Sequence, residues 1–228
     1  MPNILVIGGT GFIGSHLLKR VIKEGWSATS ISLHAPTERR FIDSVNYIQA
    51  NLDNEKEIMS CLCNGFDYVV NLGGYIDHKN FNDGGRDLID SHFIGVMNLV
   101  QSLPKDKLKC FVQIGSSDEY GNAVSPQKET IREQSISPYS FSKMAATHFL
   151  QMLNQTENFP CIILRLFLTY GPEQDIKRFL PQIIIGCLHG RTFPVSEGKQ
   201  LRDFCYIDDV VDAILCTLNA RNAIGEVI

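Results

Sequence analysis

The sequence lacks long apolar runs, a basic stripe and a charged leader. Its longest aliphatic stretches, such as residues 183–185, are far shorter than the about 20 residues that a membrane-spanning helix requires. The formal net charge is −4 and lysine and arginine are not clustered, so nucleic acid is not an expected partner. Residues 1–3 lead directly into an aliphatic run, with no cleavage site. We therefore expect a cytoplasmic protein that binds neither membrane nor nucleic acid.

Cysteine is present, but its spacing excludes the usual cysteine sites. The seven cysteines are an odd number and lack the paired Cys-x-x-Cys pattern of zinc sites. Cys61 and Cys63 form an isolated pair, while Cys110 and Cys161 lie within apolar runs. We interpret the cysteines as small core residues in a reducing compartment, and we predict no metal site.

A glycine-rich turn lies at the very start of the chain. The aliphatic run 3–7 predicts a strand buried on both faces of a parallel sheet, and residues 15–22 follow an amphipathic helical pattern. Between them Gly8, Gly11 and Gly14 permit a tight turn, close approach of a pyrophosphate and close helix packing. We therefore favour dinucleotide binding over a purely structural turn. The predicted contacts are Gly8, Thr10, Gly11, Phe12, Ile13 and Gly14.

The end of the second predicted strand, residues 28–33, bears on the choice of cofactor. Folds that bind NAD place an acidic residue there, on the ribose 2′-hydroxyl. This chain has Ser32 instead, with Arg39 and Arg40 shortly after it. Serine with arginine suits a 2′-phosphate, which slightly favours NADP over NAD, although two solvated surface arginines are an equally good interpretation. Ser32 and Arg39 are the predicted contacts.

The next part of the chain alternates strands and helices. Further strands are predicted at 45–49, 68–72, 110–114 and 161–166, and helices at 54–63, 88–103, 138–156 and 179–188. The alternation predicts an α/β fold with a Rossmann-like, doubly wound parallel sheet. Ligands bind such sheets at the carboxyl ends of the strands. The cofactor contacts expected at these ends are Asn51, Leu52, Leu72 and Gly73.

After residue 168 the alternation weakens. We predict short strands at 194–195 and 202–206, a helix at 209–218 with Asp208 as its cap, and, earlier in the chain, polar loops at 75–86 and 123–137. The chain accordingly divides into a dinucleotide-binding domain, residues 1–168, and a small, incomplete substrate-binding subdomain, residues 169–228, interleaved with the sheet.

Tyr139 and Lys143 stand one helical turn apart at the start of a predicted helix. Pro138 precedes the tyrosine, and proline is tolerated in a helix only in its first turn. We therefore expect both side chains at an exposed helix start that a cleft can reach. A phenol titrates near pH ~10, and a nearby ammonium lowers that pKa. The pair suits proton transfer to a sugar or alcohol oxygen, although an ordinary aromatic–lysine pair is the alternative.

A polar segment, residues 115–121, follows the predicted strand 110–114. It brings the hydroxyls of Ser116 and Ser117 and the carboxylate of Asp118 to a strand end where a parallel sheet opens. A plain polar loop is the alternative interpretation of this segment.

These motifs occur together in an order that resembles a known family. The glycine turn is followed by Ser-Ser-x-x-Tyr-Gly, Tyr-x-x-x-Lys, Tyr170-Gly171-Pro172 and the segment Arg202-Asp203-Phe204-x-Tyr206-x-Asp208-Asp209. The chain resembles extended short-chain dehydrogenases/reductases, and among them the NAD-dependent nucleotide-sugar epimerase/dehydratase family. The match runs through essentially all 228 residues. Members usually continue past the equivalent of residue 227 into more of the sugar-binding subdomain.

The resemblance implies a role for each matching residue. Ser116 would bond the sugar oxygen that is oxidised or reduced. Tyr139 would transfer the proton, and Lys143 would lower the tyrosine pKa and hold the nicotinamide ribose. Ser117 and Arg202 would bind a nucleotide-sugar substrate, the arginine through the phosphates.

The activity implied by the resemblance is that of an NAD(P)-dependent oxidoreductase acting at C4 of a nucleotide-activated hexose. A 4-epimerase or a 4-keto reductase is favoured. Asp118 stands where 4,6-dehydratases have a glutamate, which is one methylene longer, so a 4,6-dehydratase is the alternative. A non-catalytic dinucleotide-binding sensor is an alternative of a different class.

Three residues depart from the pattern of the family. Leu168 and His92 stand where asparagine is common, and Gly115 replaces a frequent serine. These departures bear on the substrate and the hydrogen-bond network rather than on the fold. A homodimer formed through the helices at 88–103 and 138–156 is also expected from the resemblance.

Overall fold

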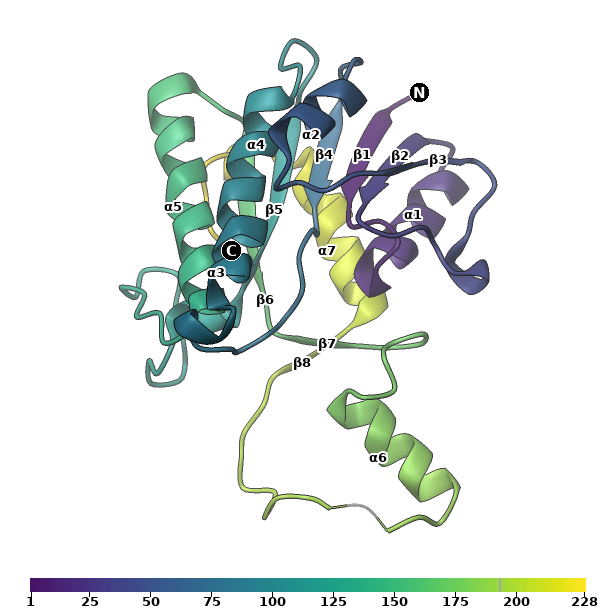
Figure 1. Ribbon diagram of the computed structural model, residues 1–228, viewed down its shortest axis with the longest axis vertical. Helices are drawn as coiled ribbons and strands as arrows, with labels where there is room; N and C mark the ends of the chain where they lie inside the picture. Colours follow the sequence, from purple (N-terminus) through teal and green to yellow (C-terminus); the bar gives the residue numbers. More distant parts are fainter. Residues whose placement is uncertain (193) are drawn as a thin grey trace.

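A six-stranded parallel sheet forms the centre of the computed structural model, which describes residues 1–192 and 194–228. The strand order is β3-β2-β1-β4-β5-β6, so the strand order reverses between β1 and β4 (Figure 1). The strands are β1 (Asn3–Ile7), β2 (Ser27–Ser32), β3 (Val45–Gln49), β4 (Tyr68–Asn71), β5 (Cys110–Ser116) and β6 (Cys161–Leu166). The predicted doubly wound fold is confirmed, and it has its switch point between β1 and β4.

Helices cover both faces of the sheet (Figure 1). One face carries α1 (Phe12–Lys23) and α7 (Ile207–Asn219); the other carries α2 (Glu55–Cys61), α3 (Gly85–Ile89), α4 (Gly95–Ser102) and α5 (Pro138–Glu157). Alternate residues of β1 therefore enter two different core clusters. Ile4 and Val6 pack with α1 and α7, whereas Leu5 and Ile7 pack with α4 and α5. Burial on both faces explains why β1 is a continuous aliphatic run.

The helix expected at 88–103 begins earlier and is not uniform. It starts as α3 at Gly85, passes through one π-helical segment, Asp90–Ile94, and continues as α4 to Ser102. A short 3-10 turn, Phe81–Asp83, precedes it, so the loop predicted at 75–86 is wrong at its end. π-Helical segments are rare and occur frequently at functional sites.

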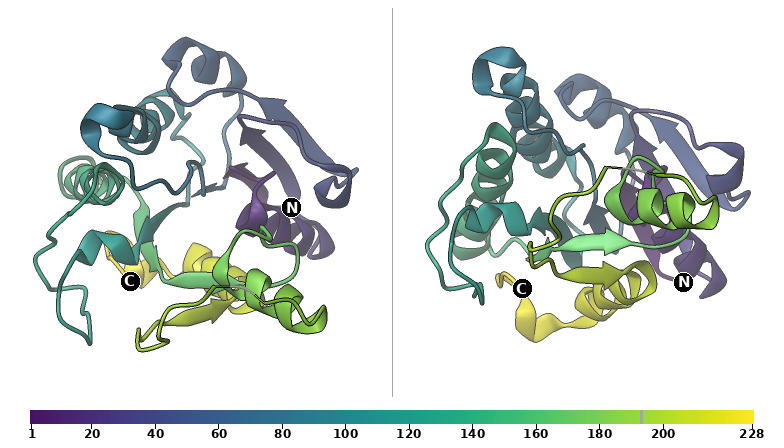
Figure 2. Two further views of the ribbon diagram at one scale, coloured as in Figure 1. Left: turned by 60° about the horizontal axis from the view of Figure 1, so that its bottom comes forward. Right: turned by 90° about the horizontal axis from the view of Figure 1, so that it is seen from below.

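The segment after β6 lies beyond the carboxyl ends of the strands (Figure 2). It contains the parallel pair β7 (Leu168–Tyr170) and β8 (Phe204–Tyr206), with the projecting helix α6 (Phe179–Leu188) between them. The strand predicted at 194–195 is wrong, since both residues lie in irregular chain. The strand predicted at 202–206 is shorter, and β7 was not predicted.

The chain then returns to the sheet through α7. Five of its side chains join the core cluster around Ile4 and Val6. Tyr206 is the N-cap of α7, so the predicted cap Asp208 instead lies in the first turn, where its charge still favours the helix. Val227 pairs with Ile163, which extends the sheet beside β6. Residues 169–228 are therefore divided between the sheet and the projecting segment.

The cysteines only partly follow the prediction. Cys110 and Cys161 are buried in the core, and Cys61 and Cys205 are partly buried and pack against it. Cys63, Cys187 and Cys216 are exposed, so the core interpretation is wrong for these three. Throughout residues 1–192 and 194–228, no helix is both long enough and apolar enough to cross a membrane.

Candidate active site

The glycine turn connects β1 to α1 at the carboxyl edge of the sheet. Gly8 has a φ of +75°, which favours glycine. A Cβ on Gly14 would overlap the carbonyl oxygen of Gly8 and lie 2.6 Å from the Cα of Gly9. Gly11 is the N-cap of α1 and has no side chain with which to cap the first N–H groups of the helix. The turn therefore fits a dinucleotide pyrophosphate, which these N–H groups and the helix dipole would bind.

Two side chains meet at Thr10, within this turn. The Oγ of Ser32, at the end of β2, accepts a hydrogen bond from the Thr10 N–H at 3.3 Å. Arg40 donates from Nη1 to the Thr10 carbonyl at 3.2 Å. Arg39, the arginine that we predicted as the contact, is exposed on the same 3-10 turn, Glu38–Arg40. The structure thus brings Arg40 to the glycine turn. The sequence alone does not show which of the two adjacent arginines reaches it.

The segment after β4 lies against the glycine turn. A Cβ on Gly8 would lie 2.9 Å from the carbonyl oxygen of Leu72. A Cβ on Gly73 would lie 3.2 Å from Leu52, which follows β3. These predicted contacts therefore gather at the switch point of the sheet. Asn51 instead uses its side-chain oxygen to accept the N–H of Asp53 at 3.1 Å, which shapes the loop before α2.

Tyr139 and Lys143 lie in the first turns of α5. The helix begins at Pro138, and the Oγ of Ser137 accepts the N–H of Ser140 at 3.1 Å as its cap. The predicted helix start is therefore confirmed. The expected exposure is wrong, because Tyr139 is 4% and Lys143 is 6% exposed. The Nζ of Lys143 donates to the carbonyl of Ile114 at 2.9 Å and lies 6.0 Å from the centroid of the Tyr139 ring.

Burial dominates the titration of this pair. It raises the pKa of Tyr139 to about 12, and the nearby charges of Asp118 and Glu119 act in the same direction. A hydrogen bond with Ser116 opposes the rise. Burial also lowers the pKa of Lys143 to about 8. The net pKa of Tyr139 therefore lies above its ordinary value, and Tyr139 carries its proton at neutral pH. The role of Lys143 in lowering that pKa stays a prediction.

Ser116 ends β5 and caps the short 3-10 helix Ser117–Tyr120. Its N–H donates to Oε1 of Glu119 at 2.9 Å, and its Oγ accepts the N–H of Asp118 at 3.2 Å. The carboxylate of Asp118 is close enough for its charge to raise the pKa of Tyr139. Ser116, Asp118 and Tyr139 are thus brought together, as the sequence predicted, at the carboxyl edge of the sheet.

A buried ion pair behind Ser116 was missed by sequence reasoning. Glu119 is fully buried, and its Oε2 accepts the Thr147 hydroxyl at 2.8 Å and the Nε of Arg165 at 3.0 Å. A Cβ on Gly115 would lie 2.5 Å from Oε1 of Glu119, which explains the glycine in place of the serine frequent in the family. Ser116-x-x-Glu119 is a capping box, and that pattern could have identified Glu119.

His92, in the π-helical segment, lies beside the Tyr139 ring at a centroid distance of 5.1 Å. Its Nε2 contacts the carbonyl of Tyr75 at 2.8 Å. A Cβ on Gly74 would lie 2.8 Å from Nε2 and overlap Cε1 and Nδ1 of the imidazole ring. Burial and the charge of Lys143 lower the pKa of His92 to about 3, so the imidazole is neutral.

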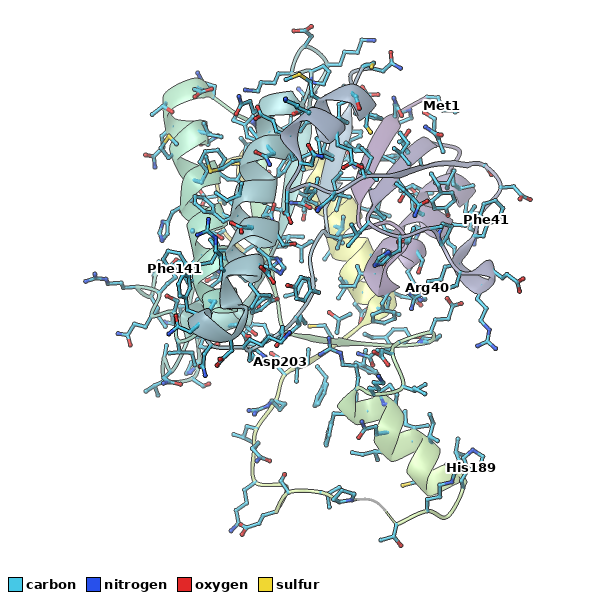
Figure 3. All side chains as sticks on the ribbon, in the orientation of Figure 1. Met1, Arg40, Phe41, Phe141, His189 and Asp203 are labelled. Carbon is cyan, nitrogen blue, oxygen red and sulfur yellow. The ribbon has the colours of Figure 1, made fainter. Side chains whose placement is uncertain are left out.

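The predicted substrate contacts lie in different surroundings. Ser117 is half-buried in the 3-10 helix next to Ser116. Arg202 is exposed in the segment that enters β8, and its Nη1 donates to the carbonyl of Leu201 at 3.1 Å. Figure 3 labels the next residue, Asp203. Arg178, which the sequence did not single out, is close enough for its charge to lower the pKa of Tyr139.

The comparison with known protein families decides which family this site belongs to. The model of the NAD dependent epimerase/dehydratase family matches residues 4–228. The chain belongs to this family. Members of the epimerase/dehydratase family are enzymes, and the resemblance drawn from the motifs is confirmed.

Individual members of the family agree with this assignment. The chain is 26% identical to a dTDP-D-glucose 4,6-dehydratase of Dictyostelium discoideum, covering 100% of this chain and 57% of that protein. It is also 26% identical to an uncharacterized UDP-glucose epimerase of Bacillus subtilis (strain 168), covering 99% of this chain and 75% of the relative. The chain is thus shorter than the curated relatives that it matches.

A solved structure shows the same fold with a cofactor. The UDP-glucuronic acid 4-epimerase of Bacillus cereus, in complex with NAD, has a TM-score of 0.87 and 26% sequence identity to this chain. The alignment covers 99% of this chain and 77% of that structure. The sheet and the glycine turn therefore belong to a fold that binds NAD in a related epimerase.

Proposed function

We propose that the chain carries the active site of an oxidoreductase that acts at C4 of a nucleotide-activated hexose, as a 4-epimerase or a 4-keto reductase. The observation that carries the proposal is the hydroxyl pair of Ser116 and Tyr139, which lies beside Lys143 at the carboxyl edge of the sheet. Membership of the family and the 4-epimerase with a similar structure support it.

The residues divide the chemistry between them. Bound NAD or NADP would supply the hydride acceptor or donor. The protonated phenol of Tyr139 donates a proton to the sugar O4 during reduction and receives it during oxidation. The hydroxyl of Ser116 bonds the same oxygen and, through its bond to Tyr139, favours the phenolate. The ammonium of Lys143, held by the carbonyl of Ile114, would stabilise the negative charge that develops when the phenolate forms.

The cofactor would bind along the switch point. Gly8, Gly11 and Gly14 hold the pyrophosphate, and Ser32 lies near the ribose 2′ position. Because β2 ends in a serine and not in an acid, we expect a slight preference for NADP over NAD. Denaturing the purified protein and identifying the released nucleotide by mass spectrometry tests this. Retained NAD alone would contradict the preference for NADP.

Substitution of Tyr139 by Phe tests the proposed reaction. The ring and its contact with His92 stay, but the proton path is lost, so turnover of a UDP-hexose or dTDP-hexose should fall by about 10²- to 10⁴-fold. Tyr68→Phe is the matched control, since Tyr68 stacks on Trp26 at the opposite edge of the sheet. Unchanged turnover in Tyr139→Phe would overturn the assignment.

A 4,6-dehydratase is the second candidate, and Asp118 favours it. Its carboxylate lies close to Tyr139, and related proteins include 4,6-dehydratases. Asp118→Asn should then abolish water loss from dTDP-glucose, while full retention would exclude this role. A non-catalytic sensor would bind the dinucleotide tightly yet turn over no nucleotide sugar in any of these assays.

We also propose that the chain forms a homodimer through α4 and α5. Phe141 and Met152 of α5 are exposed large apolar side chains, 43% and 45% respectively, and Phe141 lies on the outer side of the helix (Figure 3). A dimer would bury these side chains. Light scattering of the purified chain checks the mass of the particle, and a monomer at micromolar concentration would contradict the proposal.

A further inference from the structure

Glu173 lies between cations of two other elements, just after Gly171 and Pro172. Its Oε1 accepts the Nζ of Lys19, in α1, at 3.0 Å. Its Oε2 lies 3.9 Å from the Nε of Arg40, and its carbonyl accepts Nη2 of Arg40 at 2.7 Å. His16 contacts the carbonyl of Pro172 at 3.1 Å through Nε2. We name this group of five residues, His16, Lys19, Arg40, Pro172 and Glu173, the Glu173 clasp.

The backbone at Glu173 is held in an uncommon conformation. Its φ is +65°, in the left-handed region that residues other than glycine rarely adopt. The hydrogen bond from Lys19, followed by the charges of Lys19, His16 and Arg40, lowers the pKa of the Glu173 carboxyl. The carboxylate is therefore charged at neutral pH and is held close to the glycine turn, although it belongs to the segment that follows β7.

Arg40 connects the Glu173 clasp to the predicted cofactor site. Its Nη1 bonds the carbonyl of Thr10, while Ser32 bonds the N–H of the same residue. Ser32 occupies the end of β2, where dinucleotide folds recognise the ribose 2′ substituent and where a nearby arginine accommodates a 2′-phosphate. Arg40 is therefore placed to attract that phosphate. The same guanidinium is already partly neutralised by Glu173.

We propose that Glu173 is a positioning residue that sets the preference between NAD and NADP by holding and neutralising Arg40. This inference rests on the proposed dinucleotide site. A 2′-phosphate carries about −1.5 to −2 charges at neutral pH. It would be attracted by Arg40, whose positive charge Glu173 partly neutralises, whereas a 2′-hydroxyl is nearly indifferent to that charge. Glu173 therefore lowers the affinity for NADP selectively.

The test measures the dissociation constants of NAD⁺ and NADP⁺ for the purified full chain by calorimetry. In Glu173→Gln, which keeps the size of the side chain, we expect the constant for NADP⁺ to fall roughly two- to fivefold, as for a partly exposed ion pair. The constant for NAD⁺ should stay nearly unchanged. In an Arg40→Gln background the same substitution should no longer alter NADP⁺ binding. The selective effect should also shrink at high salt.

Glu24→Gln is the matched control. Glu24, the C-cap of α1, pairs with Arg20 of that helix, so its loss changes the net charge equally without touching Arg40. An equal change for both cofactors in Glu173→Gln would overturn the inference. So would a selective change that persists in the Arg40→Gln background. If neither cofactor binds the unaltered chain, the proposed dinucleotide site itself fails, and this inference fails with it.

Discussion

Replacement of Glu119 by glutamine should destabilise the whole fold, although it removes only one charge. The carboxylate accepts three hydrogen bonds inside the core, from the N–H of Ser116, the hydroxyl of Thr147 and the Nε of Arg165. Glutamine offers one oxygen and one NH₂ group in the same space. If the oxygen faces Arg165, the NH₂ group faces the N–H of Ser116, and two donors meet.

The magnitude follows from the ion pair with Arg165. Its side chain is 1% exposed and that of Glu119 is 0% exposed. Breaking a buried pair by removing one partner costs about 3–5 kcal/mol. Glu133 also pairs with Arg165, so the guanidinium keeps one counter-charge and the lower value applies. We expect the free energy of unfolding to fall by about 3 kcal/mol.

Urea unfolding at neutral pH measures this loss directly. In a separate thermal unfolding experiment the melting temperature should fall by roughly 6–12 °C, given about 2–4 °C per kcal/mol for a chain of this size. Glu129→Gln is the matched control, because Glu129 is exposed in the neighbouring loop, and it should change stability by less than about 0.5 kcal/mol. A loss below about 1 kcal/mol in Glu119→Gln would refute the reasoning, because it would show that the buried charge contributes little.

Two further predictions concern the surroundings of Tyr139. Gly74→Ala should lower the free energy of unfolding by at least about 2 kcal/mol, because the new Cβ would overlap His92. The control is Gly25→Ala, which measures the backbone strain of a positive φ alone, since Gly25 has a φ of +81° and no described atom lies within 4 Å of the new Cβ. Equal losses of stability in urea unfolding of the two variants would contradict the overlap. Burial lowers the pKa of Lys143 from 10.5 to about 8. Between pH about 8 and pH about 10.5 the unfolded chain therefore binds more protons at this lysine than the folded chain, so the stability that Lys143 contributes rises with pH. Urea unfolding of the natural chain and of Lys143→Met at pH 8 and pH 10 should show the natural chain gaining relative to the variant at the higher pH, and a constant difference would contradict the lowered pKa.

Much of the fold could be predicted from short stretches of sequence. The strands expected at 3–7, 45–49 and 161–166 have those bounds in the structure. For 3–7 and 161–166 the reason is that mostly aliphatic runs of this length are buried on both faces of a parallel sheet. Pro138 marked the first turn of α5, since proline fits only there. The glycine turn was predicted because only glycine allows such close packing of backbone on backbone.

The electrostatics of the site could not be predicted in the same way. The spacing of Tyr139 and Lys143 suggests that the ammonium lowers the tyrosine pKa. In the structure, burial instead raises the pKa of Tyr139 overall, because it removes water from the phenol. The π-helical segment itself has no local sequence signal that we recognised, and it places His92 against Tyr139.

The sequence by itself determined the order of strands and helices, the glycine turn and the residues that could move a proton, because each depends on neighbours within a few positions. Only the tertiary structure decided which of two adjacent arginines reaches Thr10, which glutamate is buried behind Ser116, and where Glu173 lies. Glu173 is 133 positions from Arg40, and Glu119 is 46 from Arg165. Such contacts depend on how the sheet brings distant segments together, and ion pairs and desolvation act through space rather than along the chain.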